Sequence, residues 1–187
     1  MRIIAGEYRG RTLQAPLGVT TRPTADKIRE SVFHILEGSP SPPSRAIRVL
    51  DLFAGSGALA IEALSRGAKE ATLIDADKSS LLAIRANLQS LRLDSRARVV
   101  GGQLPGALTQ LAPNQRFDLI FADPPYALDP IPTLRAAAAC AVDGGVLCLE
   151  HAASERPSPG PPWRLLQRRK WGATGVSFFE RMPDAAR

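Results

Sequence analysis

Short apolar runs alternate with segments of helical periodicity from residue 46 to residue 151. The apolar runs are rich in Val, Ile and Leu on both faces, which is typical of a parallel sheet that is covered on both sides. This alternation predicts an α/β domain built from strand–helix–strand units. The strands are expected at residues 47–53, 70–75, 97–101, 117–123 and 145–151, and the helices at residues 57–67, 78–91, 104–111 and 129–142.

The two ends of the chain show a different pattern. Residues 163–171 and 175–182 are rich in β-forming side chains and enclose a turn at Gly172, which predicts an antiparallel hairpin that completes the sheet. Residues 2–16 contain short extended runs and two glycines, which suggests a small hairpin. Residues 22–38 have helical periodicity, and a Pro- and Ser-rich linker follows them.

The predicted fold is α/β, with a doubly wound, mostly parallel, seven-stranded Rossmann-like sheet and an antiparallel C-terminal hairpin. Residues 1–45 form a small hairpin–helix extension, and residues 46–187 form the main domain. No apolar run approaches the roughly 20 residues that span a bilayer, and the N-terminus turns polar too early for a secretory signal. Cys140 and Cys148 lie on apolar segments, so we expect reduced core cysteines in a cytoplasmic protein.

Charge is distributed unevenly along the chain. The net charge of +6 comprises +3 over residues 1–45, −2 over residues 46–155 and +5 over residues 156–187. Basic ends around a slightly acidic middle suggest a polyanionic partner that the two ends hold. The alternative is a generally Arg-rich composition, since 20 of the 24 basic residues are Arg. The residues expected to contact nucleic acid are Arg9, Arg11, Arg22, Arg29, Arg168, Arg169 and Lys170.

A glycine loop, with Phe53, Gly55 and Gly57, directly follows the first strand and opens a helix. Glycines at such a position let a ligand approach the backbone and leave helix N-terminal amides free to bind it. Asp75 stands twenty residues after Gly55, at the end of the second strand, where an acid can hold two ribose hydroxyls. Asp77 is a rival for the ribose, but its position favours capping of the next helix. These residues alone are compatible with either NAD or S-adenosylmethionine.

Asp51 distinguishes between these two ligands. It lies inside the first strand, four residues before Gly55, where a dinucleotide gains little from a carboxylate. The methionine half of S-adenosylmethionine carries a free α-amino group, which a carboxylate at this position can hold. Asp51 therefore favours S-adenosylmethionine; the alternative is an Asp that only caps the loop.

The stretch ADPPY ends the fourth strand, at the edge where doubly wound folds bind ligands. The amino group of a nucleobase is a poor nucleophile because its lone pair is delocalised into the ring. Asp123 and the carbonyl group of Pro124 can accept its two hydrogens, Pro125 restricts the backbone, and Tyr126 can stack on the base. These four residues are predicted to be the catalytic residues of an in-line methyl transfer. This reaction needs no metal, and the His and Cys residues have no metal-binding spacing.

Several motifs together resemble a known family. "DLFAGSG" and "DPPY" are similar to motifs of class I S-adenosylmethionine-dependent amino-methyltransferases, while "RIIAGEYRGRTL", "RPTADKIRESVFHIL" and "WGATGVSFFER" resemble the RsmD family of bacterial rRNA guanine-N2 methyltransferases. The resemblance implies S-adenosylmethionine as cofactor and methylation of one guanine in 16S rRNA, within a partly assembled small subunit. Related enzymes commonly hold the adenine with an acidic or amide residue after the third strand, and Gln103 is the candidate here. We expect a monomer.

Other functions stay open at this point. Within the methyltransferases, the target could be adenine or a DNA strand. Asp123 argues for guanine, because guanine presents two adjacent donors on its pairing edge, whereas adenine presents a donor beside an acceptor and suits Asn. A nicotinamide oxidoreductase would use the same glycine loop but would give no role to Asp51 or to the DPPY motif. A non-catalytic RNA-binding factor would explain only the basic ends.

Overall fold

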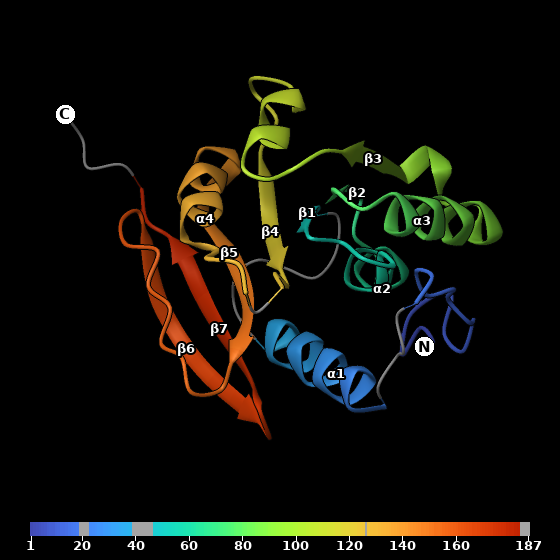
Figure 1. Ribbon diagram of the computed structural model, residues 1–187, viewed down its shortest axis with the longest axis horizontal. Coiled ribbons are helices and arrows are strands. Elements are labelled where there is room, and N and C mark those ends of the chain that lie inside the picture. The colour runs from blue at the N-terminus through green and yellow to red at the C-terminus, as the bar shows by residue number, and fades with distance from the viewer. Residues whose placement is uncertain (19–22, 39–46, 126, 184–187) are drawn as a thin grey trace.

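The computed structural model describes residues 1–18, 23–38, 47–125 and 127–183, without the side chains of residues 23–25, and its centre is one seven-stranded sheet (Figure 1). The sheet order is β3-β2-β1-β4-β5-β7-β6; β1 to β5 run parallel, and β7 and β6 form an antiparallel hairpin on β5. The predicted fold class is confirmed. The strands are β1 (Arg48–Leu52), β2 (Glu70–Asp75), β3 (Ala97–Gly101), β4 (Phe117–Ala122), β5 (Ala141–Ala152), β6 (Trp163–Trp171) and β7 (Thr174–Arg181).

The strand order reverses direction at β1. Leu52, the last residue of β1, pairs with Ile74 of β2 on one side and with Ala122 of β4 on the other. The connections from β1 therefore leave toward opposite halves of the sheet, and a crevice opens outside the carboxyl ends of the strands at this point. The glycine loop and the DPPY motif both begin at this crevice, as the sequence predicts.

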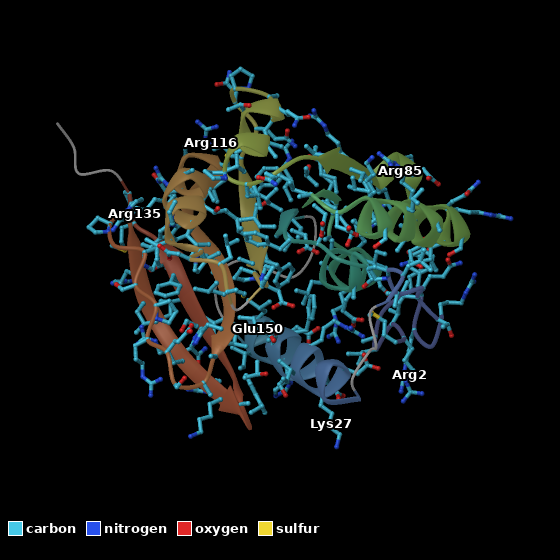
Figure 2. The ribbon with its side chains drawn as sticks, in the orientation of Figure 1. Arg2, Lys27, Arg85, Arg116, Arg135 and Glu150 are labelled. Atoms are coloured by element: carbon cyan, nitrogen blue, oxygen red, sulfur yellow. The ribbon has the colours of Figure 1, made fainter. Side chains whose placement is uncertain are left out.

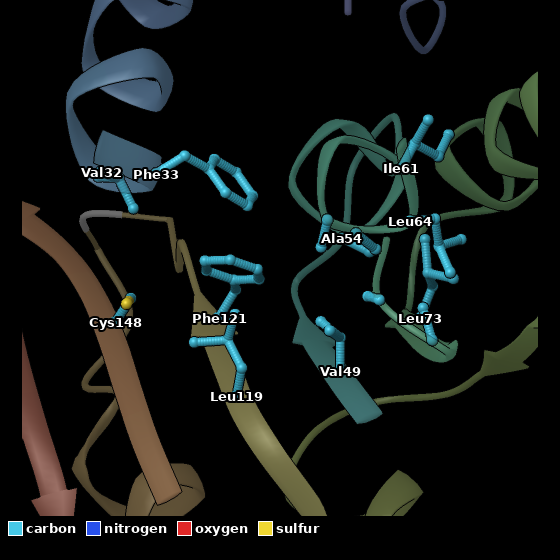
Figure 3. Close-up of a cluster of buried hydrophobic side chains, with 14 of the residues drawn as sticks. Val32, Phe33, Val49, Ala54, Ile61, Leu64, Leu73, Leu119, Phe121 and Cys148 are labelled. Atoms are coloured by element: carbon cyan, nitrogen blue, oxygen red, sulfur yellow. The ribbon is translucent and has the colours of Figure 1, made fainter. Parts of the chain in front are cut away.

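Helices cover both faces of the sheet. Alternate side chains of each strand point to opposite faces, so Val49, Leu119 and Phe121 belong to one core and Leu50 and Ile120 to the other. The first core lies under α1 (Pro23–Glu37), α2 (Ala58–Ser65) and α3 (Lys78–Leu91), and the second lies under α4 (Ile131–Ala137). Figure 3 shows the first core, in which Phe33 of α1 packs against Phe121 with ring centroids 5.6 Å apart.

The N-terminal segment is bound to α2 by a buried carboxylate. Glu62 has no exposed surface, and its two oxygens accept hydrogen bonds from the backbone amides of Ile4 (2.8 Å) and Ala5 (3.0 Å). Two arginines surround the same carboxylate: Arg66 lies 2.8 Å and Arg29 3.9 Å from it. The predicted hairpin is present but short: around one antiparallel bridge between residues 2 and 12, the amides of Ile3 and Leu13 donate to the carbonyl groups of Arg11 (2.9 Å) and Met1 (3.1 Å).

Two predicted helices are shorter than expected. Residues 104–111 form only a short 3-10 helix (Gly106–Gln110), because Pro105 lacks an amide hydrogen and Gly106 favours helix poorly. The predicted helix over residues 129–142 ends as α4 at Ala137, and β5 already begins at Ala141, opposite Phe117 of β4. None of the helices that the structure describes is both long enough and apolar enough to cross a membrane.

Candidate active site

Two adjoining cavities occupy the crevice at the carboxyl ends of the strands. The larger has a volume of about 930 Å³, and the smaller, against α1, of about 200 Å³. Phe53, Gly55, Asp123 and Glu150 line both of them. Tyr126 lies outside the described residues. Of the predicted cofactor and catalytic residues, the cavity walls contain Asp51, Phe53, Gly55, Asp75, Gln103, Asp123, Pro124 and Pro125.

At Gly55, the backbone of the glycine loop lines both cavities without a side chain to cover it. This residue has φ +56°, in the left-handed region that favours glycine, and a Cβ atom there would meet no atom within 4 Å. The amide of Gly55 donates a 2.7 Å hydrogen bond to Asp75, so the loop is tied to the end of β2. The absence of a side chain at Gly55 leaves room for a ligand to lie against the loop.

Gly57 has a different role from the one expected. It lines neither cavity, and a Cβ atom there would lie 2.9 Å from the side chain of Leu73, inside the hydrophobic core. Its φ of +79° starts α2 in a conformation that other residues rarely adopt. Gly57 therefore fixes the turn between the loop and α2, and a larger residue would disturb the core rather than block a ligand.

Asp75 and Asp77 have separate functions. Asp77 caps α3: its carboxylate accepts a 2.7 Å hydrogen bond from the amide of Ser80, as expected. Asp75 is half-buried in the wall of the larger cavity and is oriented by the amides of Gly55 and Asp77. Both acids line the larger cavity, but the carboxylate of Asp77 is used by the helix cap, whereas that of Asp75 is held by two loop amides at the end of β2 and suits a ribose diol.

Asp51 is a buried carboxylate without a cationic partner among the described residues. Its side chain is 1% exposed and accepts one hydrogen bond, from the amide of Ala60 (3.1 Å). Burial raises the pKa of Asp51 to about 8, against the effect of this hydrogen bond, and the nearby charges of Asp123 and Asp75 raise it further. Such a site is suited to a cation that enters the smaller cavity.

The DPPY motif forms the wall opposite the glycine loop. Asp123 follows Phe121 in the alternation of β4, so both side chains lie on the α1 face of the sheet. The carboxylate is accessible from the cavities but has protein on its other sides, and this loss of hydration raises the pKa of Asp123 to about 6. Pro124 is buried beside it, and the carbonyl group of Pro125 accepts a 2.8 Å hydrogen bond from the amide of Leu128.

Glu150 is a site residue that the sequence analysis missed. It lies near the end of β5, two residues after the buried Cys148 on the same face, and lines both cavities. Figure 2 shows it where β5 passes α1. Burial, and then the charge of Asp123, raise the pKa of Glu150 to about 8. The sequence did contain a signal for this residue: an acid near the end of an otherwise apolar predicted strand, at the same edge of the sheet as Asp123.

The predicted nucleic-acid contacts differ in their exposure. Arg9, Arg11, Arg169 and Lys170 are exposed. Arg29 is 6% exposed, and its guanidinium donates to the carbonyl group of residue 2 and to Asp26; it therefore belongs to the attachment of the N-terminal segment and not to a nucleic-acid surface. The half-buried Arg168 donates to Ser177 (3.2 Å) and to the carbonyl group of Pro157 (2.9 Å). Arg22 lies outside the described residues.

Comparison with known proteins covers nearly the whole chain. The family model described as "Conserved hypothetical protein 95" matches residues 1–180. YlbH of Bacillus subtilis (strain 168) is 36% identical over 186 residues, which are 97% of this chain and 99% of that protein. "Ribosomal RNA small subunit methyltransferase D" of Escherichia coli (strain K12) is 40% identical over 126 residues, 67% of this chain and 60% of that protein. The solved structure of yhhF from Escherichia coli has a TM-score of 0.82 and 32% identity, and the match covers 98% of this chain and 99% of that one.

Proposed function

The chain belongs to the Conserved hypothetical protein 95 family, the RsmD family of class I methyltransferases, and we propose that it methylates the N2 amino group of one guanine in 16S rRNA. The methyl donor is S-adenosylmethionine. The observation that carries the proposal is the pair Asp51 and Asp123, on adjacent strands and on one face of the sheet. The first carboxylate is sealed in the floor of the smaller cavity, whereas the second is open to both cavities, so one suits a bound cation and the other an incoming base.

The cavity residues fit S-adenosylmethionine. Asp51 holds the α-amino group, the bare backbone at Gly55 lies against the ligand, and Asp75 accepts hydrogen bonds from the ribose hydroxyls. The apolar side chain of Phe53 and the amide of Gln103 are available to the adenine at the wall of the larger cavity. When bound, the cofactor supplies an electrophilic methyl group on a sulfonium.

The residues at the DPPY end orient the base. Asp123 and the carbonyl group of Pro124 accept the two hydrogens of the N2 amino group, which directs its lone pair away from the ring and toward the cofactor. The gain in rate comes mainly from this orientation. Asp123 is a carboxylate rather than an amide, which suits the donors of guanine better than the mixed edge of adenine.

Exposed cations near the same edge hold the RNA. Thr174 pairs with Ala152 at the end of β5, so the β6–β7 turn, with Arg169 and Lys170 beside it, projects past the carboxyl edge of the sheet (Figure 1). Arg9 and Arg11 lie on the N-terminal segment. An rRNA substrate supports a cytoplasmic enzyme. The family resemblance further supports a partly assembled small subunit as the substrate, and we propose that the enzyme acts as a monomer.

Binding of the two candidate cofactors distinguishes a methyltransferase from an oxidoreductase. We expect isothermal titration calorimetry to show binding of S-adenosylmethionine and none of NAD at the same concentrations. Binding of NAD alone would contradict the proposal, because Asp51 would then have no ligand group to hold.

The affinity for S-adenosylmethionine should rise between pH 6 and pH 7.5. In the free protein the pKa of Asp51 is about 8, so its carboxyl is mostly protonated in this range. A bound ammonium group favours the ionised form, and binding therefore releases a proton and strengthens as pH rises, by up to about tenfold per pH unit. An ordinary α-amino group, with a pKa of about 7.7–8.0, stays largely protonated over this window.

The control for this pH dependence is Asp51→Asn, which keeps the shape of the side chain but cannot ionise. The variant should bind more weakly and should lose most of the rise with pH, while Asp123 and Glu150 remain as in the parent. Titrations in two buffers with different ionisation enthalpies count the released protons. Equal proton release by parent and variant would show that Asp51 does not hold the ammonium group.

Reversing two charges at the hairpin should weaken RNA binding. We expect the double variant Arg169→Glu and Lys170→Glu to reduce the slope of log affinity against log salt by about 2, since each lost phosphate contact removes roughly one unit. Cofactor affinity should not change. Arg116→Glu is the matched control, because Arg116 precedes β4 at the opposite end of the strand (Figure 2). A slope unchanged in the double variant would mean that the hairpin does not contact RNA.

A further inference from the structure

Two carboxylates, those of Asp123 and Glu150, lie side by side in the wall that the two cavities share. Ala122 of β4 pairs with Leu149 of β5, so Asp123 and Glu150 are the next residues along two adjacent parallel strands. Both continue the alternation of the α1 face, after Phe121 and Cys148, and both line both cavities. Their mutual repulsion is part of the reason that the pKa of Glu150 is raised.

The carboxylate of Glu150 has no donor among the residues that the structure describes. The other buried or half-buried acids at this edge and on α2 each accept at least one hydrogen bond: Glu62 from Ile4 and Ala5, Asp51 from Ala60 and Asp75 from Gly55. Glu150 is half-buried and its carboxylate faces the cavities, so its acceptor oxygens are open to a ligand that enters them. The unused acceptor capacity of Glu150 points into the space where a base would meet the cofactor.

We propose that Glu150 is a second acceptor for the target base and takes the ring N1–H of guanine, while Asp123 and the carbonyl group of Pro124 take the N2 amino group. This assignment rests on the proposed function and deepens it. When one hydrogen of the N2 amino group is on Asp123 and the other is on the carbonyl group of Pro124, the neighbouring ring N1–H of guanine remains for Glu150. The donors of the base also relieve the repulsion between the two carboxylates.

Glu150 thereby determines which base is accepted. Adenine presents an acceptor, its own N1, where guanine presents the N1–H. At a pH above about 8, where Glu150 is ionised, this acceptor would face another lone pair in a place from which water has been displaced, and a site built for a donor rejects an analogue that lacks it. Asp123 acts on the amino group that both bases have, whereas Glu150 acts on the atom in which they differ.

The test compares Glu150→Gln with the parent on two RNAs, one with guanosine and one with 2-aminopurine at the methylated position. 2-Aminopurine keeps the amino group but has no ring N1–H. On the guanosine RNA we expect the variant to lose about 10- to 100-fold in kcat/KM, since one buried donor is left mispaired. On the 2-aminopurine RNA the parent is already slow, and the variant should be no slower or should gain activity, since the amide of Gln can donate to the unprotonated N1.

Two further measurements separate this role from a general loss of structure. The affinity of Glu150→Gln for S-adenosylmethionine should equal that of the parent by calorimetry. Glu155→Gln makes the same chemical change at an exposed position that lines neither cavity, and it should keep full activity on both RNAs.

The outcomes are distinguishable. An equal loss on guanosine and on 2-aminopurine, or full activity of Glu150→Gln on the guanosine RNA, would overturn the assignment of Glu150 and leave the proposed function standing. A parent protein that methylates neither RNA would overturn both. Loss of cofactor affinity in Glu150→Gln would place this residue in the cofactor site and would also overturn the assignment.

Discussion

Asp123→Ala is expected to abolish methyl transfer, with a loss of at least about 100-fold, and to leave the affinity for S-adenosylmethionine unchanged. The variant removes the carboxylate that accepts a hydrogen of the target amino group, and contacts of this kind at a reacting centre contribute about 10²- to 10³-fold. The affinity for the cofactor should persist because Asp51, Gly55 and Asp75 are untouched. Activity is measured as transfer of a labelled methyl group to the natural RNA.

Asp123→Asn separates the shape of the side chain from its charge. The amide should cost at least about 10-fold, because its NH₂ group opposes a donor of the base and one mispaired buried donor costs roughly 1–3 kcal/mol. Asp94→Ala, at an exposed acid remote from both cavities, serves as the control and should be fully active. An Asn variant as active as the parent would mean that Asp123 does not contact the donors of the base.

Glu62→Ala should lower the free energy of unfolding by about 3–5 kcal/mol, as breaking a buried ion pair commonly does. The substitution leaves two backbone amides of the N-terminal segment without their acceptor and removes the buried carboxylate from Arg29 and Arg66, which keep only their pairs with Asp26 and Glu37. Glu70→Ala is the matched control. Glu70 pairs with Arg48 on the surface, with both side chains more than 40% exposed, and such pairs contribute about 0–1 kcal/mol.

Urea denaturation followed by circular dichroism measures both variants. A loss below about 1 kcal/mol in Glu62→Ala would mean that the N-terminal segment is held by its apolar residues Ile3 and Leu13 and not by the buried carboxylate. The outcome bears on function as well, because the segment carries Arg9 and Arg11 and must be held in place for these cations to form part of an RNA surface.

The strands and the long helices were predictable because local pattern and tertiary environment agree in them. The helix over residues 78–91 and the strands over residues 70–75 and 97–101 have the bounds that the apolar periodicity predicts. The predictions failed where a distant partner decides the conformation. The amides of Ile4 and Ala5 bind Glu62 across the fold, so the predicted hairpin stays short, and β5 extends back to Ala141 because β4 lies beside it.

The positions of the acidic residues of the candidate site could be predicted from the sequence, whereas the roles of Gly57 and of Arg29 could not. Asp51, Asp75 and Asp123 follow from strand alternation and from the rule that parallel strands end at a common edge. A side chain at Gly57 would point toward Leu73 because of the positive φ, and neither this φ nor the closeness of Leu73 can be read from the sequence. Arg29 looks like a free cation until the fold brings Glu62 beside it.

The central claim is tested most directly by identifying the methylated nucleoside. The purified protein is incubated with methyl-labelled S-adenosylmethionine and with 16S rRNA from a strain that lacks the corresponding gene, as naked RNA and as partly assembled small subunits. The RNA is then digested to nucleosides and analysed by mass spectrometry. We predict label in N2-methylguanosine at one position. Label in N6-methyladenosine, or no label in either form of the RNA, would contradict the account.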